Sequence, residues 1–440
     1  MKKSIPLVIL MIMLMMVTVS WSNVLSYGDE VEAEIAMHLK NAEEYESKEI
    51  YIEAVAEYQA VLKLRPDDYD LAMRIVGLYD TLGIKNKYVS ACENAISADN
   101  TQKEPYMLLA DYYISCSNYS KAYSVLNKAK SHIPNDNEIE SLILDIKKRY
   151  TTITLSYKEV TDFHIFDTSK SKTGYGIAHI DEKMAVVNDG GGISFSADGY
   201  EEFGFLEDGL RPVKKNGQYF YIDKDQYKRM VPDEEASYLG AFSNGYAVAC
   251  FSDGYGYINK SGKIVKRGYK YAGGFARGIA PVQDQSGQWY VINTSFSRVV
   301  EDSFDEIKIS DLGYCTENGM FFAKKGDTYT LYNNTGEKIA EGFEDVKLFV
   351  SNEPAAIKQN GKWGFVNTSG KIVIEPKYDN ANSFNVGYAP ICDGNKWGAI
   401  DIDCNVLIEP EFESMRSFSK GGYSLVKTED KFKMVVVNLY

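Results

Sequence analysis

The chain has 440 residues, of which 45% are hydrophobic and 25% charged, a composition typical of a globular protein with room for two separate cores. Its 62 acidic side chains outnumber the 48 basic ones, and the formal net charge is −14. Because nucleic-acid binding depends on clustered Lys and Arg side chains that displace counterions, this balance argues against nucleic acid as a partner.

The first 27 residues are predicted to be a targeting segment. Lys2 and Lys3 precede an almost unbroken apolar run over residues 5–19, and Ser20 and Ser22 follow it. The serines suit the cleavage site of a signal peptide, whereas residues 5–25 are also long enough to cross the roughly 30 Å hydrocarbon core of a membrane as an uncleaved anchor. Since the lysines favour a cytoplasmic N-terminus, both alternatives place the remaining chain outside the cytoplasm, secreted or anchored.

Residues 28–150 show a repeat of 34 residues. Tyr45, Tyr79 and Tyr113 recur at this spacing, and so do two further sets: Ala54, Tyr88 and Ala122, and Pro66, Asn100 and Pro134. Apolar residues within each unit follow helical spacing, which predicts two antiparallel helices per unit and therefore an α-solenoid of about three repeats. An apolar stripe over residues 138–149 predicts a final capping helix.

This pattern resembles the tetratricopeptide repeat, although the family's Leu-Gly pair is replaced and Tyr88 stands where the family has a small residue. The resemblance implies a groove, lined by the first helix of each unit, that binds an extended peptide or a partner helix. The groove residues carried over from the family are mostly apolar or acidic: Leu39, Glu43, Met73, Gly77, Asp80, Met107, Asp111 and Ile114. Alternatively, the apolar members belong to the core and the carboxylates to a solvated face.

Residues 151–440 carry a second repeat, also of 34 residues. The clearest copy, GKWGFVNTSGKIVIEPKYD over 361–379, is echoed over 395–412. Fainter copies have large residues at the Trp position, and a degenerate eighth copy lies near 192–199; the Trp-position residues are Tyr219, Tyr255, Trp289, Tyr329 and Phe432. Each copy is expected to form a β-meander of three short strands.

The two ends of this second region predict a closed ring. The last copy lacks its Ile-Val-Ile strand, and residues 153–160 match that strand. One unit built from both ends would remove the open sheet edge that otherwise invites aggregation. We therefore expect an all-β domain closed as a β-propeller of seven or eight blades.

The dipeptides Trp363-Gly364 and Trp397-Gly398 resemble the motif that names the WG-repeat proteins of bacteria. This resemblance implies a β-repeat domain on secreted or surface proteins, and it supplies neither catalytic residues nor a ligand. The two tryptophans could stack against sugar rings, but one large residue per repeat is more typical of packing between blades.

The sequence predicts no enzyme, cofactor or metal site. Its four histidines match no metalloprotease spacing, its six cysteines form no Cys-x-x-Cys pair, and no nucleophile elbow or phosphate-binding loop is present. The first functional hypothesis is a non-enzymatic extracytoplasmic scaffold that recognises a protein or peptide through the helical groove and presents a second surface on the ring. The alternative is a cell-envelope glycan-binding protein, or a weak glycan-active enzyme, built on the ring. In both, the N-terminal segment alone contacts the membrane.

Overall fold

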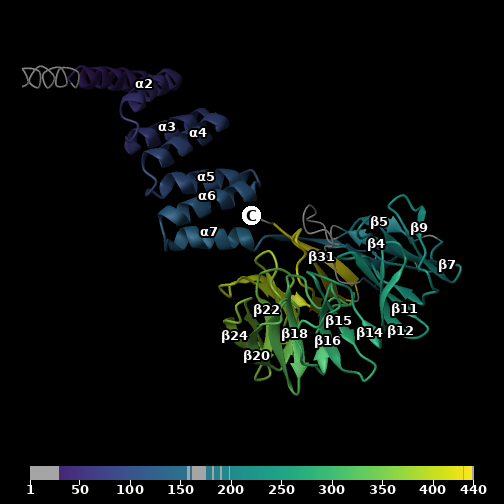
Figure 1. Ribbon diagram of the computed structural model, residues 1–440. Helices are drawn as coiled ribbons and strands as arrows, with labels where there is room; N and C mark the ends of the chain where they lie inside the picture. Colours follow the sequence, from purple (N-terminus) through teal and green to yellow (C-terminus); the bar gives the residue numbers. More distant parts are fainter. Residues whose placement is uncertain are drawn as a thin grey trace, which may run out of the picture. The chain divides into compact units, whose positions relative to one another are not determined.

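The computed structural model describes residues 29–155, 159–160, 175–180, 183–188, 191–197, 199–429 and 431–438 (Figure 1). The chain divides between Ile146 and Lys147 into two compact units, a helical array and a β-domain. The predicted targeting segment over residues 1–27 lies outside the described residues. Within them, no helix is both long enough and apolar enough to span a membrane.

The described part of the array contains three helix pairs and a final single helix. The first helix covers residues 29–47, and the others are α2 (Tyr51–Leu64), α3 (Tyr69–Leu82), α4 (Lys85–Ala98), α5 (Glu104–Ser115), α6 (Tyr119–His132) and α7 (Asn137–Lys147). Pro66 and Pro134 lie just beyond the ends of α2 and α6, because proline cannot continue a helix. The predicted tetratricopeptide-like solenoid with its capping helix is confirmed.

Small residues allow the paired helices to approach closely. Ala54, Ala110 and Ala122 are fully buried, and the larger side chains of Tyr58 and Leu126 fill the adjoining space. These residues belong to one continuous apolar core that runs through the whole array. Stacking of neighbouring repeats therefore supplies the burial that no single pair of helices could provide.

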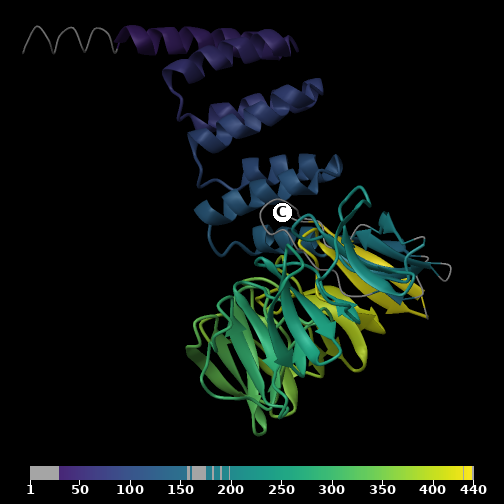
Figure 2. The ribbon, with the colours of Figure 1, turned by 45° about the vertical axis from the view of Figure 1, so that its right-hand side comes forward.

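The β-domain consists of eight antiparallel sheets, the blades of a propeller (Figures 1 and 2). Blades 1 and 2 contain β2 (Glu159–Val160), β3 (Tyr175–Ile180), β4 (Lys183–Asn188) and β5 (Ile193–Ser196), then β6 (Glu202–Phe203), β7 (Arg211–Lys215), β8 (Gln218–Ile222) and β9 (Lys228–Met230). Blades 3 and 4 contain β10 (Tyr238–Leu239), β11 (Tyr246–Phe251), β12 (Gly254–Asn259) and β13 (Ile264–Tyr269), then β14 (Tyr271–Ala272), β15 (Ile279–Gln283) and β16 (Trp289–Asn293).

Blades 5 to 8 complete the domain. Blades 5 and 6 contain β17 (Glu306–Ile307), β18 (Met320–Lys325), β19 (Thr328–Asn333) and β20 (Lys338–Phe343), then β21 (Asp345–Val346), β22 (Ala355–Gln359), β23 (Lys362–Val366) and β24 (Ile372–Tyr378). Blades 7 and 8 contain β25 (Asn380–Ala381), β26 (Ala389–Asp393), β27 (Lys396–Ile400) and β28 (Val406–Phe412), then β29 (Ser414–Met415), β30 (Tyr423–Thr428), β31 (Lys431–Val437) and β1 (Tyr150–Thr154).

The eighth blade closes the ring with strands from both ends of the domain. β1 pairs antiparallel with β31, and Ile153 lies opposite Met434. In Figure 2 the yellow C-terminal strands accordingly lie beside the dark teal first blade. Met434 and Leu425 share a buried cluster with Ala178 of that blade. The predicted closure is confirmed. The degenerate eighth copy predicted near residues 192–199 is not a separate blade, because these residues contain β5, the fourth strand of blade 1.

The prediction of three strands per copy is wrong for most blades. Each blade begins with a two-residue strand that carries no detectable periodicity, so seven of the eight sheets have four strands. The fourth strand forms the outer edge: β13 exposes four of its six residues, whereas β11 buries four of six. The two-residue first strand therefore lies at the opposite, inner edge of the blade.

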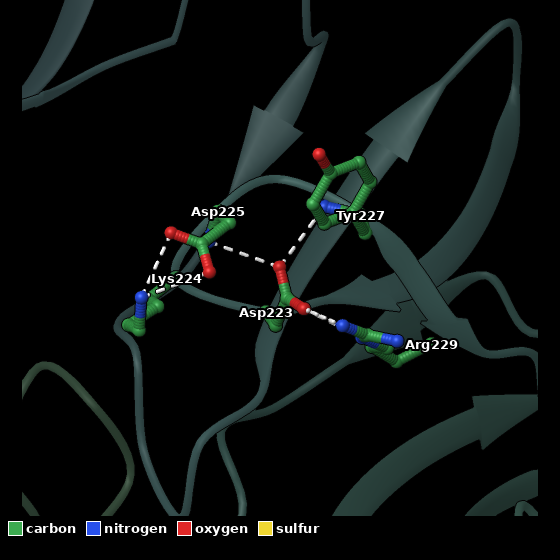
Figure 3. A network of polar contacts seen from close by, with 5 residues as sticks. All are labelled: Asp223, Lys224, Asp225, Tyr227 and Arg229. Atoms are coloured by element: carbon green, nitrogen blue, oxygen red, sulfur yellow. Dashed lines mark hydrogen bonds and ion pairs between the residues drawn. The ribbon is translucent and has the colours of Figure 1, made fainter.

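An Asn or Asp side chain fixes the turn after the third strand. In blade 2, Asp223 Oδ1 accepts hydrogen bonds from the N–H groups of Asp225 and Tyr227 at 2.9 and 3.0 Å, and Arg229 Nε donates to Asp223 Oδ2 at 2.5 Å (Figure 3). The equivalent residues of the next five blades accept the same two backbone bonds: Asn259, Asn293, Asn333, Asn367 and Asp401. This local bonding explains the Asn of the repeat motif.

The glycine of the Trp-Gly dipeptide makes room for the neighbouring strand. A Cβ atom on Gly364 would lie 2.5 Å from the carbonyl oxygen of Ile374 and 2.6 Å from the nitrogen of Pro376. A Cβ atom on Gly398 would lie 2.3 Å from the carbonyl oxygen of Ile408. At both positions the register between the third and fourth strands shifts by a β-bulge. The bulge brings the backbones so close that only glycine fits.

Replacing Gly364 tests this packing. Gly364→Ala should destabilise the β-domain by about 1–3 kcal/mol, because the added methyl group meets backbone atoms that cannot move aside. Calorimetry of the full chain should show a lower melting temperature for the β-domain and an unchanged transition for the helical array. An unchanged β-domain transition would contradict the crowding argument.

Candidate functional site

The eight predicted groove residues lie on the first helix of each pair. Leu39 and Glu43 lie on the helix over residues 29–47, Met73, Gly77 and Asp80 on α3, and Met107, Asp111 and Ile114 on α5. Within each helix their spacing is three or four residues, so they share one helix face. The structure thus gives each helix a common face, and the binding role of that face stays a prediction.

Both interpretations of these residues hold in part. Four apolar side chains are partly buried and pack against the core of the array: Leu39, Met73, Met107 and Ile114. The remaining four residues are exposed: Glu43, Gly77, Asp80 and Asp111. A Cβ atom on Gly77 would meet nothing within 4 Å. The face therefore combines anchored apolar groups, exposed carboxylates and an open space at the middle of α3.

One tyrosine that sequence analysis left outside the groove, Tyr88, lies near two of its carboxylates. Tyr88 of α4 is 8% exposed, and its ring centroid lies 6.0 Å from that of Tyr112 on α5. Burial raises the pKa of Tyr88 to about 12, and Cys92, Asp80 and Asp111 add smaller contributions. Both aspartates therefore lie near the same neutral phenol. The signal in the sequence was Tyr88 itself, a large residue where the family has a small one.

The carboxylates of the first repeat are arranged differently. Arg74 Nε on α3 donates to Glu46 at 2.9 Å, and the Arg74 guanidinium lies 5.5 Å from the ring centroid of Tyr58. The Tyr58 hydroxyl also donates to Glu46, at 2.9 Å. This network engages Glu46 with a cation and a hydroxyl, whereas the predicted face carboxylates Glu43, Asp80 and Asp111 are exposed.

A second candidate site is a cavity of about 300 Å³ along blades 2 to 4, which Ile177 of blade 1 and residues 311–314 of blade 5 also line. Five tyrosines line it: Tyr219, Tyr238, Tyr255, Tyr271 and Tyr314. The ring centroids of Tyr255 and Tyr271 lie 5.5 Å apart. Burial raises the pKa of Tyr271 to about 12, so this phenol stays neutral near pH 7 and can both donate and accept hydrogen bonds. Sequence analysis missed this cluster because its members come from different blades.

Two carboxylates line the same cavity, those of Glu202 and Asp311. Glu202 accepts hydrogen bonds from the Tyr219 hydroxyl at 2.5 Å and from Lys214 Nζ at 3.1 Å. Burial acts to raise the pKa of Glu202, but these two hydrogen bonds outweigh it and the pKa is lowered. A general acid needs a raised pKa, so Glu202 is better suited to accept hydrogen bonds than to donate a proton.

The two tryptophans of the repeat dipeptides differ in exposure. Trp363 is 5% exposed and belongs to a buried cluster shared by blades 6 and 7. Trp397 is half-buried. Trp363 therefore packs between blades, as one of the two interpretations predicted, and offers no open face to a sugar ring.

In the described part of the chain, no group of three or more His, Cys, Asp or Glu residues is placed to hold a metal ion. All six cysteines are free, and Cys92, Cys315 and Cys392 are buried. Burial raises the pKa of Cys92 to about 11 and that of Cys315 to about 12. These two thiols stay protonated near pH 7 and are therefore poor nucleophiles.

Four segments of the β-domain match the family model described as the WG containing repeat: residues 255–289, 329–363, 363–397 and 397–432. Each segment runs from one predicted Trp-position residue to the next, and so spans parts of two consecutive blades. The predicted resemblance is confirmed over these residues. No curated protein matches the sequence.

Several solved structures resemble about a quarter of the chain. MamA is 16% identical with a TM-score of 0.21, covering 25% of this chain and 61% of that chain. The TPR2B-domain:pHsp70-complex of yeast Sti1 is 21% identical with a TM-score of 0.21, and the match covers 25% of this chain and 94% of that chain. The Arabidopsis OM64 TPR domain is 14% identical with a TM-score of 0.22, covering 27% and 98%.

The helix pairs, the blades and the family match lead to one description of the chain. An array of tetratricopeptide-like helix pairs precedes an eight-bladed β-propeller, four segments of which match the WG containing repeat.

Proposed function

We propose that the protein is a non-catalytic scaffold outside the cytoplasm, whose helical array binds a protein or peptide partner. The observation that carries this proposal is the open space at Gly77 of α3, one helical turn from half-buried Met73. On α5, Met107 packs against the same core. Asp80 and Asp111 are both exposed and both lie near Tyr88. A partner segment with one apolar and one basic side chain complements this face, because methionine adapts to varied apolar shapes and carboxylates attract Lys or Arg.

A pair of substitutions at Gly77 separates binding from folding. Gly77→Ala should stabilise the array by about 0.5–1 kcal/mol, because alanine is a better helix former and meets no neighbour there. Gly77→Trp should fill the open space and reduce partner capture at least tenfold. The measurement is crosslinking and pull-down from intact cells with residues 28–440. The partners are defined as the proteins that both wild type and Gly77→Ala recover, and their recovery by Gly77→Trp is then compared.

Circular dichroism must show equal helix content in the two Gly77 variants. If Gly77→Trp folds normally and captures the same proteins as Gly77→Ala, the groove assignment is wrong.

The tyrosine-lined cavity supports a second candidate function, the binding of a neutral glycan by the ring. Aromatic rings stack on the apolar faces of sugars, and neutral phenols together with an ionised carboxylate supply hydrogen bonds to sugar hydroxyls. Tyr238, which is 42% exposed, presents the most accessible ring in the cavity. The lowered pKa of Glu202 favours binding over hydrolysis at this site.

Tyr238→Ala tests the glycan candidate. Loss of the exposed ring should weaken retention on purified cell-wall glycan about tenfold, the effect of one aromatic contact of about 1.4 kcal/mol. Tyr227→Ala is the matched control, because Tyr227 is 65% exposed and lies outside the cavity. Equal retention of both variants, or no retention of the wild type, would remove this candidate.

The proposed location rests on the sequence of residues 1–27. Protease added to spheroplasts of the native host should digest the chain while a cytoplasmic marker stays intact. N-terminal sequencing of the protein from cells that received no protease separates the alternatives. A start at Met1 in the membrane fraction indicates an anchor, and a start between residues 20 and 28 indicates a cleaved signal peptide. Full protection from protease would contradict an extracytoplasmic location.

A further inference from the structure

One structurally equivalent position recurs at the inner edge of blades 2 to 8. It is the residue directly after the two-residue first strand, and its N–H donates to a carbonyl oxygen of the second strand at 2.8–3.0 Å. The donor and acceptor pairs are Gly204 and Pro212, Gly240 and Val248, Gly273 and Pro281, Lys308 and Phe322, Lys347 and Ala356, Asn382 and Pro390, and Arg416 and Leu425. The shared hydrogen bond establishes that these seven residues, here called the inner position, are equivalent.

The inner position divides the ring into two halves. It is glycine in blades 2 to 4, where the tyrosine-lined cavity lies. In blades 5 to 8 it is Lys308, Lys347, Asn382 and Arg416, and these four residues line a different cavity of about 500 Å³. A change at one repeat position therefore supplies three of the five cations of the second cavity, here called the basic cavity.

The basic cavity carries positive charge in an acidic protein. Five cationic side chains line it: Arg277, Lys308, Lys347, Arg416 and Lys420. Only two carboxylates line it, those of Asp311 and Glu317, which leaves a net charge of +3 where the whole chain has −14. Because composition alone would make such a cavity negative, the cluster of like charges is a local feature that an anion would stabilise.

Neutral groups orient several of these cations. Arg277 Nε donates to the carbonyl oxygen of Glu317 at 2.9 Å. Lys347 Nζ lies 5.4 Å from the ring centroid of Trp363, and Lys308 Nζ lies 5.7 Å from that of Tyr329. Carbonyl groups and aromatic rings hold a cation without cancelling its charge. Lys308 also forms an ion pair with Asp345 at 3.1 Å, which neutralises one cation in part.

Hydrogen bonds between blades hold the wall of the basic cavity. Asn382 Nδ2 donates to the carbonyl oxygen of Met415 at 2.7 Å, and Asn385 Nδ2 donates to that of Phe418 at 2.8 Å. Ser417 Oγ donates to the carbonyl oxygen of Ser383 at 3.0 Å. A wall fixed in this way binds a ligand with less loss of conformational entropy than a mobile loop would.

We propose that the basic cavity binds a compact polyanion, a small ligand that carries at least two phosphate or carboxylate groups close together. A volume of about 500 Å³ suits a small molecule rather than a protein segment. Cations from blades 4, 5, 6 and 8 line it together, so two adjacent anionic groups can contact cations of more than one blade at once. This site lies in the ring and does not depend on the proposed partner of the helical array.

Inorganic pyrophosphate and tricarballylate are suitable probes, with trehalose as the neutral control. Titration calorimetry of the full chain should show binding of at least one of the two anions. The anion that binds more tightly indicates whether the ligand carries phosphate or carboxylate groups. The double variant Lys347→Gln and Arg416→Gln should bind at least tenfold more weakly. The matched control, Lys263→Gln with Lys371→Gln, removes two exposed lysines of equivalent turns outside the cavity and should bind like the wild type.

Two measurements on the wild-type protein test the proposal even if the variants misfold. Its affinity for the bound anion should fall as the salt concentration rises from about 0.05 to 0.2 M, and the anion should raise the melting temperature of the β-domain. Absence of binding by both anions, equal binding by the two double variants, or an affinity independent of salt would each overturn the proposal.

Discussion

The pairing of β1 with β31 is the interaction on which the β-domain depends. Eight meanders in a row would leave one unpaired strand edge and one uncovered apolar blade face at each end. The pairing joins residues separated by almost the whole domain, with Thr152 opposite Val435. Because the entropy of closing so long a loop must be offset by contacts throughout the ring, the blades share their stability and are not independent folding units.

Within the closed ring, repeat positions divide into those that serve the backbone and those that shape a surface. Asn367 and its equivalents fix a turn, and Gly364 makes room for a bulge. These residues recur because every blade has the same backbone requirement. At the inner position every blade shares the backbone N–H bond, but the side chain varies between glycine, asparagine and cations. Space decides part of this choice, because a Cβ atom on Gly273 would lie 2.1 Å from the carbonyl oxygen of Gly313. Two cavities of different chemistry, one rich in tyrosine and one basic, can therefore form in the same ring.

The 34-residue periods predicted the helix pairs and the blades because both depend on apolar residues at fixed spacing. The match between residues 153–160 and the missing strand predicted how the ring closes. What the sequence could not reveal depends on contacts between blades or on elements too short to show a pattern. The two-residue strands belong to the second kind. Tyr238 and Tyr271 belong to the first, since they come together only when consecutive blades pack.

The groove residues show the same limit at the level of single side chains. Their spacing along each helix predicted a shared face, and the structure places them on the first helices as the family pattern implies. The pattern gave no measure of how far Met73 or Ile114 is buried, because burial depends on the neighbouring repeat. Tyr88 is a second example. It departs from the family pattern, and only the structure shows that its ring lies near Asp80 and Asp111.

The repeat aromatic residues link the frame of the ring to its basic cavity. Trp363 is nearly inaccessible, so it cannot bind a sugar, yet its ring lies 5.4 Å from Lys347 Nζ of the same blade. Tyr329 has the same relation to Lys308 in the preceding blade, at 5.7 Å. A cation held over an aromatic face gains about 0.5–1 kcal/mol or more and keeps its charge. An aromatic residue that recurs for packing therefore also orients a cation wherever the inner position of the same blade is a lysine.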